Sequence, residues 1–369
     1  MLRAANGTEY PTAGIVAIVA AAMRQPPLTP GGMAVYNPAM LPSLRYVPLC
    51  CLLFSVLLEA QGPGGAAPPA KPDSAAVQSL VAKTKKSGGA MWAEEEHFFC
   101  EAPRANSPND PPIEPTKIFD NVYVIGNQGT VVYVISTSDG LLMFDSLAAN
   151  QVETQLLPGF QKLGMDPAKV KVIVMGHGHA DHFGGSPYMQ EHYGSKVYIS
   201  AADWDLMEHP PAGRGGEKKG PPPVLPKHDQ VVVEGQPIVL GDFRMVPVAI
   251  PGHTPGSMGY TFSVKDNGKT RTAAIYGGTI LTPGIISDEG LQTYSKSVAH
   301  FKEETKKAKV EVELQNHPLM DPIQAKLDKL KARKPGEPNP FVVGQANYQK
   351  FVDVIAGCTQ VNIARRKGV

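Results

Sequence analysis

The stretch Gly176-His177-Gly178-His179-Ala180-Asp181-His182 places three imidazoles and one carboxylate close together in the chain. It directly follows the apolar run Val170-Lys171-Val172-Ile173-Val174-Met175, which predicts a buried β-strand. Proteins of the α/β class commonly carry their chemistry at the ends of such strands. Imidazole nitrogen and carboxylate oxygen are ligands that zinc accepts, usually roughly three or four around one ion. The stretch therefore predicts a metal site, and its four donors leave room for a second ion.

Two more histidines follow predicted strands in the same way. His253 lies in the loop Pro251-Gly252-His253-Thr254-Pro255-Gly256-Ser257, after the apolar run 243–250. His317 lies in Asn316-His317-Pro318, after the run 310–314. A single histidine most often has a structural role, but six donors in three strand-end loops indicate a metal centre. The other histidines have no such neighbours and are assigned no site role: His97, His192, His209, His228 and His300.

Together these loops resemble the metallo-β-lactamase superfamily, whose pattern combines an H-x-H-x-D-H run, a later G-H-x-P-G loop and a further histidine. The resemblance extends from about residue 118 to the C-terminus. It implies an α/β fold, a four-layer αβ/βα sandwich with the metals at one edge between two sheets. It also implies two Zn²⁺ ions. The first would be bound by His177, His179 and His253, and the second by Asp181, His182 and His317.

The residue at position 279 distinguishes branches of this superfamily. Many of its hydrolases resemble one another in a bridging aspartate that ends the strand after the G-H-x-P-G loop, whereas this chain has Thr279 there. A threonine hydroxyl is a poor bridge between zinc ions. The lack of a carboxylate or cysteine at this position, with His182 as a ligand, resembles the third subclass of class B β-lactamases. Thr279 would replace a serine that does not bind metal.

The resemblance implies a hydrolase that opens the β-lactam amide of antibiotics by attack of a metal-bound hydroxide. Asp181 would be the catalytic residue that binds the second zinc and orients the nucleophile. Thr279 and Thr282 are the candidate contacts for the substrate carboxylate. The chain departs from the subclass at Leu281 and Ile285, where a serine and a tyrosine are expected. A zinc hydrolase of the same fold acting on another lactone, ester or amide is therefore the alternative. A zinc protein without catalysis is the third hypothesis.

Two further residues near these loops have predicted structural roles. Asp145 ends the predicted strand 141–145 and resembles the superfamily's inner aspartate, so we predict that it supports the metal loops rather than binding metal. Ser257 lacks the G-x-S-x-G surroundings of a serine nucleophile, so we predict that it forms a turn.

The composition is typical of a globular protein with a sizeable core, with 42% hydrophobic and 19% charged residues in a chain of 369. A formal net charge of +1 argues against a nucleic-acid-binding surface, so the expected partner is a small-molecule substrate. The basic run 214–219 is most simply a solvated loop, and a position at the rim of the metal site is the alternative.

The N-terminal region predicts export. The apolar run 47–58, preceded by Arg45 and followed by Ala60, is typical of a signal peptide and too short for a stable membrane span in the mature protein. We expect translation to start at Met40 or Met33. The predicted segments are an extension over 1–39 upstream of the true start, a signal peptide over 40–60, a Pro/Gly/Ala-rich linker over 61–90 and a catalytic domain over 91–369.

Cysteine usage agrees with a periplasmic or secreted protein. Of the four cysteines, Cys50 and Cys51 would leave with the signal peptide, and Cys100 and Cys358 would remain. An even count permits one disulfide in an oxidising compartment. The third subclass often pairs two C-terminal cysteines instead, so the sequence leaves the pairing open.

Apolar periodicity and capping residues predict ten strands and five helices, without a repeat of fixed period. The strands are expected near 117–125, 131–137, 141–145, 170–175, 196–200, 230–234, 237–249, 258–264, 271–277 and 310–314. The helices are expected near 150–163, 186–193, 291–307, 322–333 and 345–364.

Overall fold

The computed structural model describes residues 72–102, 107, 110–210, 222–281 and 286–369. All of these residues belong to the compact unit Ala70–Val369. None of the helices among them has both the length and the apolar character needed to cross a membrane. Several predictions fall outside the described residues: the extension, the signal peptide, the basic run 214–219, Thr282 and Ile285.

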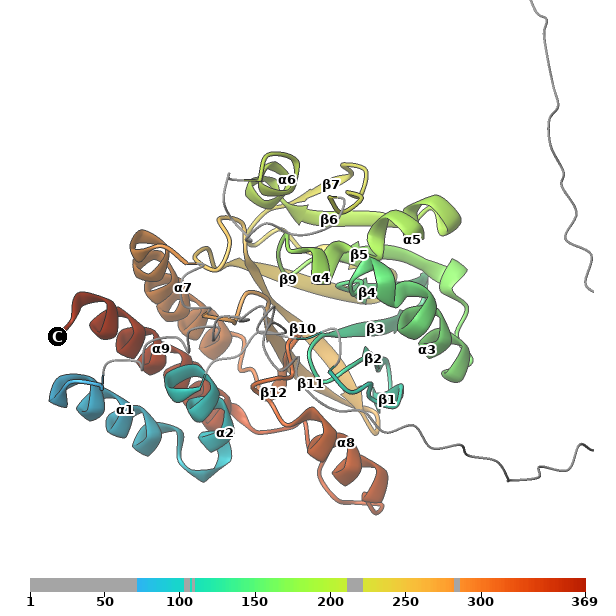
Figure 1. Cartoon of the computed structure of the whole chain (residues 1–369). Helices are drawn as coiled ribbons and strands as arrows, with labels where there is room; N and C mark the ends of the chain where they lie inside the picture. The colour runs from blue at the N-terminus through green and yellow to red at the C-terminus, as the bar shows by residue number, and fades with distance from the viewer. Residues whose placement is uncertain (1–71, 103–106, 108–109, 211–221, 282–285) are drawn as a thin grey trace, which may run out of the picture. The chain divides into compact units, whose positions relative to one another are not determined.

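Two mixed β-sheets form the centre of the unit Ala70–Val369 (Figure 1). In the seven-stranded sheet, β1 to β4 are antiparallel and β4 to β7 are parallel. Its strands, in spatial order, are β1 (Thr116–Phe119), β2 (Val122–Gly126), β3 (Val131–Thr137), β4 (Gly140–Phe144), β5 (Val170–Val174), β6 (Lys196–Ser200) and β7 (Gln230–Val232).

In the five-stranded sheet, β8 to β11 are antiparallel neighbours and β12 lies parallel to β11. Its spatial order is β12-β11-β10-β9-β8. The strands are β8 (Ile238–Leu240), β9 (Phe243–Ala249), β10 (Met258–Asp266), β11 (Lys269–Tyr276) and β12 (Val312–Leu314).

Helices cover the outer face of each sheet (Figure 1). The seven-stranded sheet packs against α3 (Leu157–Lys162), α4 (Ala180–Phe183), α5 (Ser186–Tyr193) and α6 (Ala201–Glu208). The five-stranded sheet packs against α7 (Asp288–Lys307) and α9 (Gln345–Lys367), and α1 (Ala75–Gly88) and α2 (Ala93–Glu96) pack against α9. α8 (Ile323–Ala332) packs against the core between the sheets. Short 3-10 or π segments are η1 (Ala90–Trp92), η2 (His97–Glu101), η3 (Ala149–Gln151), η4 (Val152–Leu156) and η5 (Pro167–Lys169).

Three separate apolar cores correspond to the three interfaces of a four-layer sandwich. Strand β3 shows how the sequence builds two of them. Val131, Tyr133 and Ile135 belong to the core between the sheets. Val132 and Val134 belong to the core beneath α3 to α6, because successive side chains of a strand point to opposite faces. The architecture confirms the predicted αβ/βα sandwich.

Most predicted elements are present, but two predicted strands are each divided by a turn. The strand expected over 117–125 forms β1 and β2, separated by a turn at Asp120 and Asn121. The strand expected over 237–249 forms β8 and β9, because Gly241 adopts a φ of +55° and turns the chain. The helix expected over 150–163 is present as the consecutive segments η3, η4 and α3.

The linker predicted over 61–90 is wrong for residues 75–88, which form α1. Ser74 begins this helix by accepting a hydrogen bond from the backbone N–H of Val77 at 3.1 Å. Val77 is buried, and Leu80 and Val81 pack against the same core as α9. The Pro- and Gly-rich composition therefore ends before α1 begins, and the spacing of Val77, Leu80 and Val81 places them on one face of the helix, which packs against the core.

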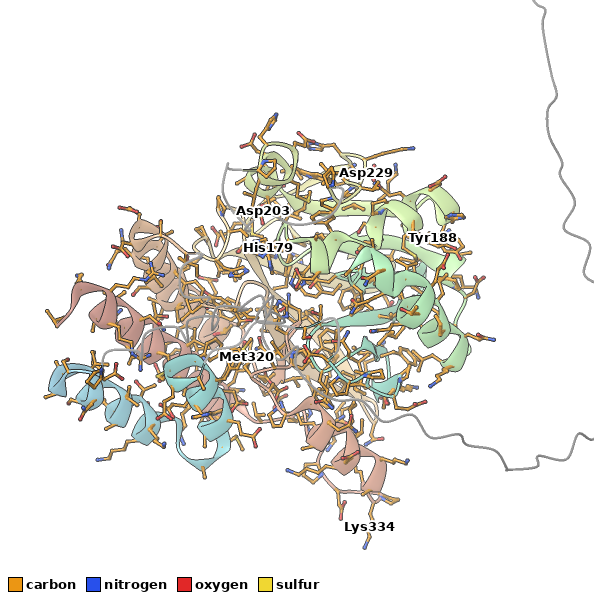
Figure 2. The ribbon with its side chains drawn as sticks, in the orientation of Figure 1. His179, Tyr188, Asp203, Asp229, Met320 and Lys334 are labelled. Carbon is orange, nitrogen blue, oxygen red and sulfur yellow. A yellow bond between two sulfur atoms is a disulfide. The ribbon has the colours of Figure 1, made fainter. Side chains whose placement is uncertain are left out.

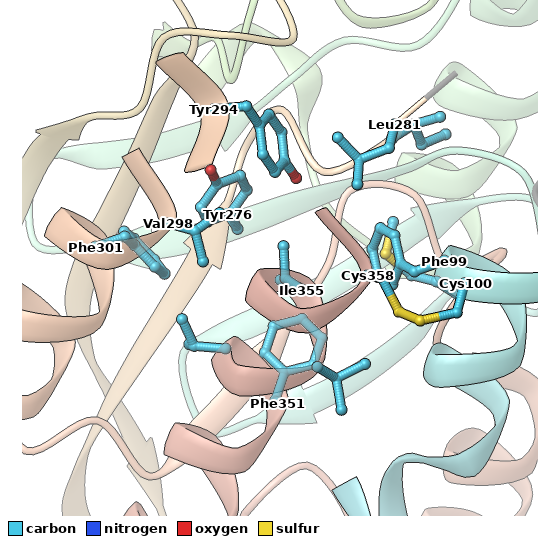
Figure 3. Packing of buried hydrophobic residues seen from close by; sticks show 14 of the residues in the cluster. Phe99, Cys100, Tyr276, Leu281, Tyr294, Val298, Phe301, Phe351, Ile355 and Cys358 are labelled. Carbon is cyan, nitrogen blue, oxygen red and sulfur yellow. A yellow bond between two sulfur atoms is a disulfide. The ribbon is translucent and has the colours of Figure 1, made fainter. Parts of the chain in front are cut away.

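Cys100 and Cys358 form a disulfide between residues 258 positions apart in the chain. The bond joins η2 to α9 within the core that also contains Phe99 and Leu281 (Figure 3). This resolves the pairing that the sequence left open. A disulfide agrees with an oxidising compartment, while periplasmic or secreted location itself stays a prediction.

Candidate metal centre

Three loops from both sheets meet at the carboxyl ends of their strands. β5 leads to the loop that carries His177, β9 leads to His253, and β12 leads to His317. Two glycines permit a close approach of these backbone segments. A Cβ on Gly176 would lie 2.7 Å from the carbonyl oxygen of Gly277, and a Cβ on Gly277 would lie 2.2 Å from a backbone oxygen of β10. The predicted convergence of these loops is therefore present.

The first group of ligands forms a compact triangle of nitrogens. Nε2 of His177 lies 3.0 Å from Nδ1 of His179 and 3.1 Å from Nε2 of His253. The third side, from His253 Nε2 to His179 Nδ1, is 3.2 Å. Nitrogens bound to one tetrahedral zinc at about 2.0–2.1 Å are about 3.3 Å apart. The spacing therefore suits one zinc ion.

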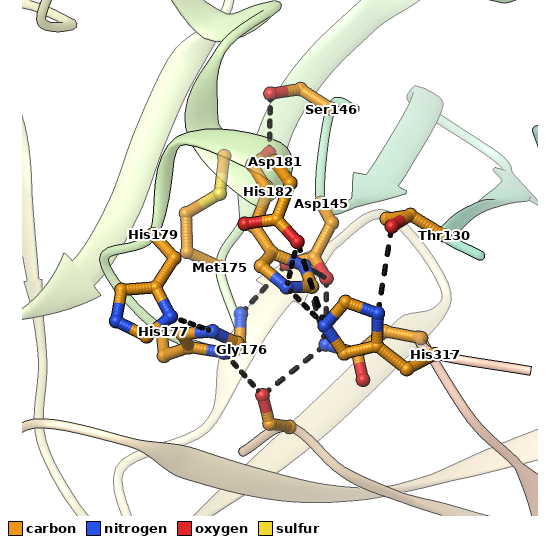
Figure 4. A network of polar contacts seen from close by, with 12 residues as sticks. Thr130, Asp145, Ser146, Met175, Gly176, His177, His179, Asp181, His182 and His317 are labelled. Atoms are coloured by element: carbon orange, nitrogen blue, oxygen red, sulfur yellow. Dashed lines mark hydrogen bonds and ion pairs between the residues drawn. The ribbon is translucent and has the colours of Figure 1, made fainter. Parts of the chain in front are cut away.

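The second group lies beside the first (Figure 4). Nε2 of His182 lies 2.9 Å from Nε2 of His317. The carboxylate Oδ2 of Asp181 lies 3.5 Å and 3.6 Å from these two nitrogens. His177 also has a ligand atom within 4.8 Å of those of His182 and His317, so the two groups adjoin. All six predicted donors are thus brought together.

Hydrogen bonds at the outer nitrogens determine which atom of each ring faces the centre. Three rings donate an Nδ1–H to a backbone carbonyl: His177 to Gly277 at 2.6 Å, His253 to Ile280 at 2.6 Å, and His317 to Gly129 at 2.8 Å. In a neutral imidazole the other nitrogen, Nε2, then carries a lone pair. Lone pairs facing one another at these distances repel unless a cation lies between them. The donor set therefore fits metal ions.

Burial and neighbouring rings keep most of these imidazoles neutral. Burial, followed by the nearby imidazoles, holds the pKa of His177 and of His253 well below the usual range. Burial, with the charge of His182, lowers the pKa of His317 to about 4. Neutral imidazole is the form that binds metal.

His182 and Asp181 interact with each other as well as with their neighbours. Burial would lower the pKa of His182, but Asp181 and Asp145 outweigh it and raise the pKa to about 8. Burial would likewise raise the pKa of Asp181, but His182 and His317 outweigh it and lower the pKa. Asp181 is therefore an anion, and a metal ion at this group would displace a proton from His182.

Asp145 holds two of the three loops together. Its Oδ1 accepts a hydrogen bond from the backbone N–H of Gly176 at 2.8 Å. Its Oδ2 accepts from Nδ1 of His182 at 2.7 Å and from Nδ2 of Asn316 at 2.9 Å. Asp145 also has a φ of +61°, a conformation that non-glycine residues rarely adopt and that surrounding contacts must maintain. These contacts confirm its predicted supporting role.

Asp203 holds the third loop and was not predicted from the sequence. It is fully buried on α6, beside the loop that carries His179 (Figure 2). Its Oδ2 accepts from the backbone N–H of Gly178 at 2.8 Å and from Oγ1 of Thr254 at 2.7 Å. Its Oδ1 accepts from the backbone N–H of Gly256 at 2.8 Å. Burial raises the pKa of Asp203, and these three donors oppose the shift.

Replacing Asp203 with alanine is expected to loosen both loops, because three buried donors lose their acceptor. We expect the free energy of unfolding to fall by about 2–4 kcal/mol, and zinc affinity to fall by roughly 10–100-fold. Denaturant unfolding and a zinc titration measure the two effects. Asp205→Ala is the matched control on the same helix, since that side chain is 78% exposed. Equal losses in both variants would contradict the role of Asp203.

Two hydroxyl residues beside the loops occupy different environments. Ser257 accepts a hydrogen bond from the backbone N–H of Thr254 at 3.0 Å, which confirms its turn role. Thr279 is fully buried, and its Oγ1 has no hydrogen-bond partner among the described residues. A substrate group could reach this hydroxyl only if neighbouring side chains moved. The predicted contact between Thr279 and substrate stays a prediction.

Known proteins with similar sequences place this arrangement in a family. Residues 125–266 match the model of the metallo-beta-lactamase superfamily. This chain contains a metallo-β-lactamase domain. The chain is 26% identical over 168 residues to the probable metallo-hydrolase YflN of Bacillus subtilis, covering 42% of this chain and 59% of that protein. It is 30% identical over 118 residues to the hydroxyacylglutathione hydrolase GloC of Haemophilus influenzae, covering 30% and 52%. The matches thus span less than two thirds of either relative.

Solved structures share the metallo-β-lactamase fold over most of the described residues. BJP-1 of Bradyrhizobium japonicum, a subclass B3 metallo-β-lactamase, is 28% identical, with a TM-score of 0.57. The alignment covers 70% of this chain and 94% of BJP-1. The FEZ-1 metallo-β-lactamase of Legionella gormanii is 22% identical, with a TM-score of 0.62, over 71% of this chain and 100% of FEZ-1. The predicted family resemblance and fold are confirmed.

Proposed function

We propose that this protein is a hydrolase that uses two zinc ions to open the β-lactam amide of antibiotics. The observation that carries the proposal is the division of the donors into two adjoining groups. One group has three histidine nitrogens 3.0–3.2 Å apart. The other pairs His182 and His317 with the carboxylate of Asp181. Thr279, rather than a carboxylate, occupies the position after β11 where many relatives have a bridging aspartate.

The chain's own residues would bind the ions and orient the reaction. Zinc bound here would polarise the substrate carbonyl and lower the pKa of a bound water to about 7. The side chain of Asp181 is 29% exposed, whereas that of His182 is fully buried. The carboxylate of Asp181 can therefore accept a hydrogen bond from the attacking water and orient the water toward the substrate. Ser257 is engaged in its turn, so the proposal involves no acyl-enzyme.

Another substrate class is favoured by the surroundings of Thr279. The hydroxyl of Thr279 is buried, and Leu281 is only 3% exposed within an apolar core. Neither side chain therefore offers the polar contact that a β-lactam carboxylate would use at this place. GloC, a relative of part of this chain, is named for hydrolysis of a hydroxyacylglutathione. The second candidate function is hydrolysis of another lactone, ester or amide at the same metal centre.

Turnover of the chromogenic cephalosporin nitrocefin by zinc-loaded protein tests the proposal. We expect ring opening that a chelator abolishes and that added Zn²⁺ restores. In the proposed reaction the bound ions both activate the water and polarise the carbonyl, so hydrolysis requires them. A lactone and a thioester are assayed in parallel on the same preparation. Protein that holds two zinc ions and hydrolyses only these substrates would replace the first function with the second. Protein that holds two zinc ions and hydrolyses none of them would contradict both.

A further inference from the structure

A buried ammonium group lies between two carboxylates that flank His317 in the sequence. Nζ of Lys326, on α8, lies 2.6 Å from Oε2 of Glu313 and 2.6 Å from Oδ1 of Asp321. The side chain of Lys326 is 12% exposed, and those of Glu313 and Asp321 are 0% and 3% exposed. Buried ion pairs with such short contacts are sensitive to the loss of either partner.

The two carboxylates flank His317 symmetrically in the sequence. Glu313 lies on β12, four residues before His317, and Asp321 lies four residues after it. The segment between β12 and α8 contains neither helix nor strand, and few backbone hydrogen bonds hold it. Lys326 therefore joins the two ends of the loop that presents His317.

Other contacts hold the ring of His317 and the start of its loop. Its Nδ1–H bonds to the carbonyl of Gly129 at 2.8 Å, and the neighbouring Asn316 bonds to Asp145 at 2.9 Å. These bonds orient the ring and the start of the loop. Farther along the loop, the backbone N–H of Asp321 donates to the carbonyl of Pro318 at 3.3 Å, and the ion pair between Asp321 and Lys326 ties this turn to α8.

The surroundings of Lys326 keep it charged. Burial would lower its pKa, but Asp321 and Glu313 outweigh burial and raise it. The ring of Phe341 lies 5.5 Å from Nζ and adds a favourable contact for a cation. Glu95 faces the same cluster, and burial followed by the charge of Asp321 raises its pKa to about 9, so it is neutral at pH 7.

We propose that Lys326 is a positioning residue for His317, and through it for the second group of metal ligands. By tying both ends of the loop, it fixes the distance between His317 and its partners His182 and Asp181. This inference rests on the proposed metal-dependent function. It concerns metal affinity, however, and can be tested without any substrate.

The test compares Lys326→Met with Lys326→Arg in the full mature protein, titrated with Co²⁺ and Zn²⁺. We expect Lys326→Met to bind the second ion roughly 10–100-fold more weakly while the first ion binds as in the wild type. Lys326→Arg restores a cation that can contact both carboxylates, so we expect much of the affinity to return. Arg333→Gln is the control, because it breaks a comparably buried ion pair with Asp266 away from the loop.

Two results would overturn the inference. One is a Lys326→Met protein that binds both ions as the wild type does. The other is an Arg333→Gln protein with the same selective loss, which would attribute the effect to general destabilisation. If Lys326→Met does not fold, Asp321→Asn replaces it, because this variant weakens the contact with Lys326 at one end of the loop and keeps the ion pair with Glu313 at the other. We expect the same selective loss of affinity for the second ion. Failure of the wild type to open β-lactams, with normal binding of two ions, would overturn the proposed function alone.

Discussion

Replacing His177 with alanine is expected to remove both metal binding and hydrolysis. Its Nε2 lies 3.0 Å and 3.1 Å from the nitrogens of His179 and His253, and the ring also belongs to the buried group with His182 and His317. Its loss therefore opens the first triangle and weakens the second group. We expect kcat/KM to fall by roughly 10³-fold or more, because in the proposed reaction both carbonyl polarisation and water activation depend on the ions.

Zinc content and turnover, measured on one preparation, test this result. His228→Ala is the control, because its ring is exposed and stacks on Trp204 with the centroids 4.3 Å apart. That variant is expected to keep wild-type zinc content and activity. A His177→Ala protein that retains two zinc ions and near-normal turnover would show that His177 does not bind the ions.

The candidate metal ligands could be predicted from the sequence because their signal is local. Each ligand lies a few residues after an apolar run, and strand ends at one side of a sheet meet in space. The contacts that support the ligands depend on packing instead. Asp203 reaches Gly178 and Gly256, which are 25 and 53 residues away in the chain. The one local signal near Asp203 is Ser200, a helix-capping residue three positions earlier. Its side chain caps α6 by accepting a hydrogen bond from the backbone N–H of Asp203.

The same distinction applies to the fold. Nearly continuous apolar runs located β3 and β5 closely, because both faces of these strands are buried. α1 was missed although Val77, Leu80 and Val81 have helical spacing, because the residues before them are rich in Pro, Gly and Ala. Packing against α9, the most distant element in the chain, stabilises it. The sequence pattern also could not reveal that Lys326 connects the two ends of the His317 loop, since one lysine in a helix has no distinguishing pattern.

The disulfide between Cys100 and Cys358 is expected to make the largest single covalent contribution to stability. Closing a loop between residues 258 positions apart removes much conformational freedom from the unfolded chain. The chain-entropy model gives a contribution of about 5.6 kcal/mol for a loop of this size. We therefore expect the Cys100→Ala/Cys358→Ala protein to lose up to about that free energy of unfolding. Denaturant unfolding of the metal-free protein measures it.

Comparison with Arg365→Gln separates the disulfide from the other links between the N-terminal segment and α9. Arg365 pairs with Asp73 at 2.7 Å, but both side chains are 29% exposed, so this ion pair is worth only about 1 kcal/mol or less. A disulfide that acts by restraining the unfolded chain should also accelerate refolding of the oxidised protein relative to the double-alanine variant. A difference in unfolding free energy no larger than that of Arg365→Gln would mean that packing of Phe99 and α1, rather than the bond, holds this layer in place.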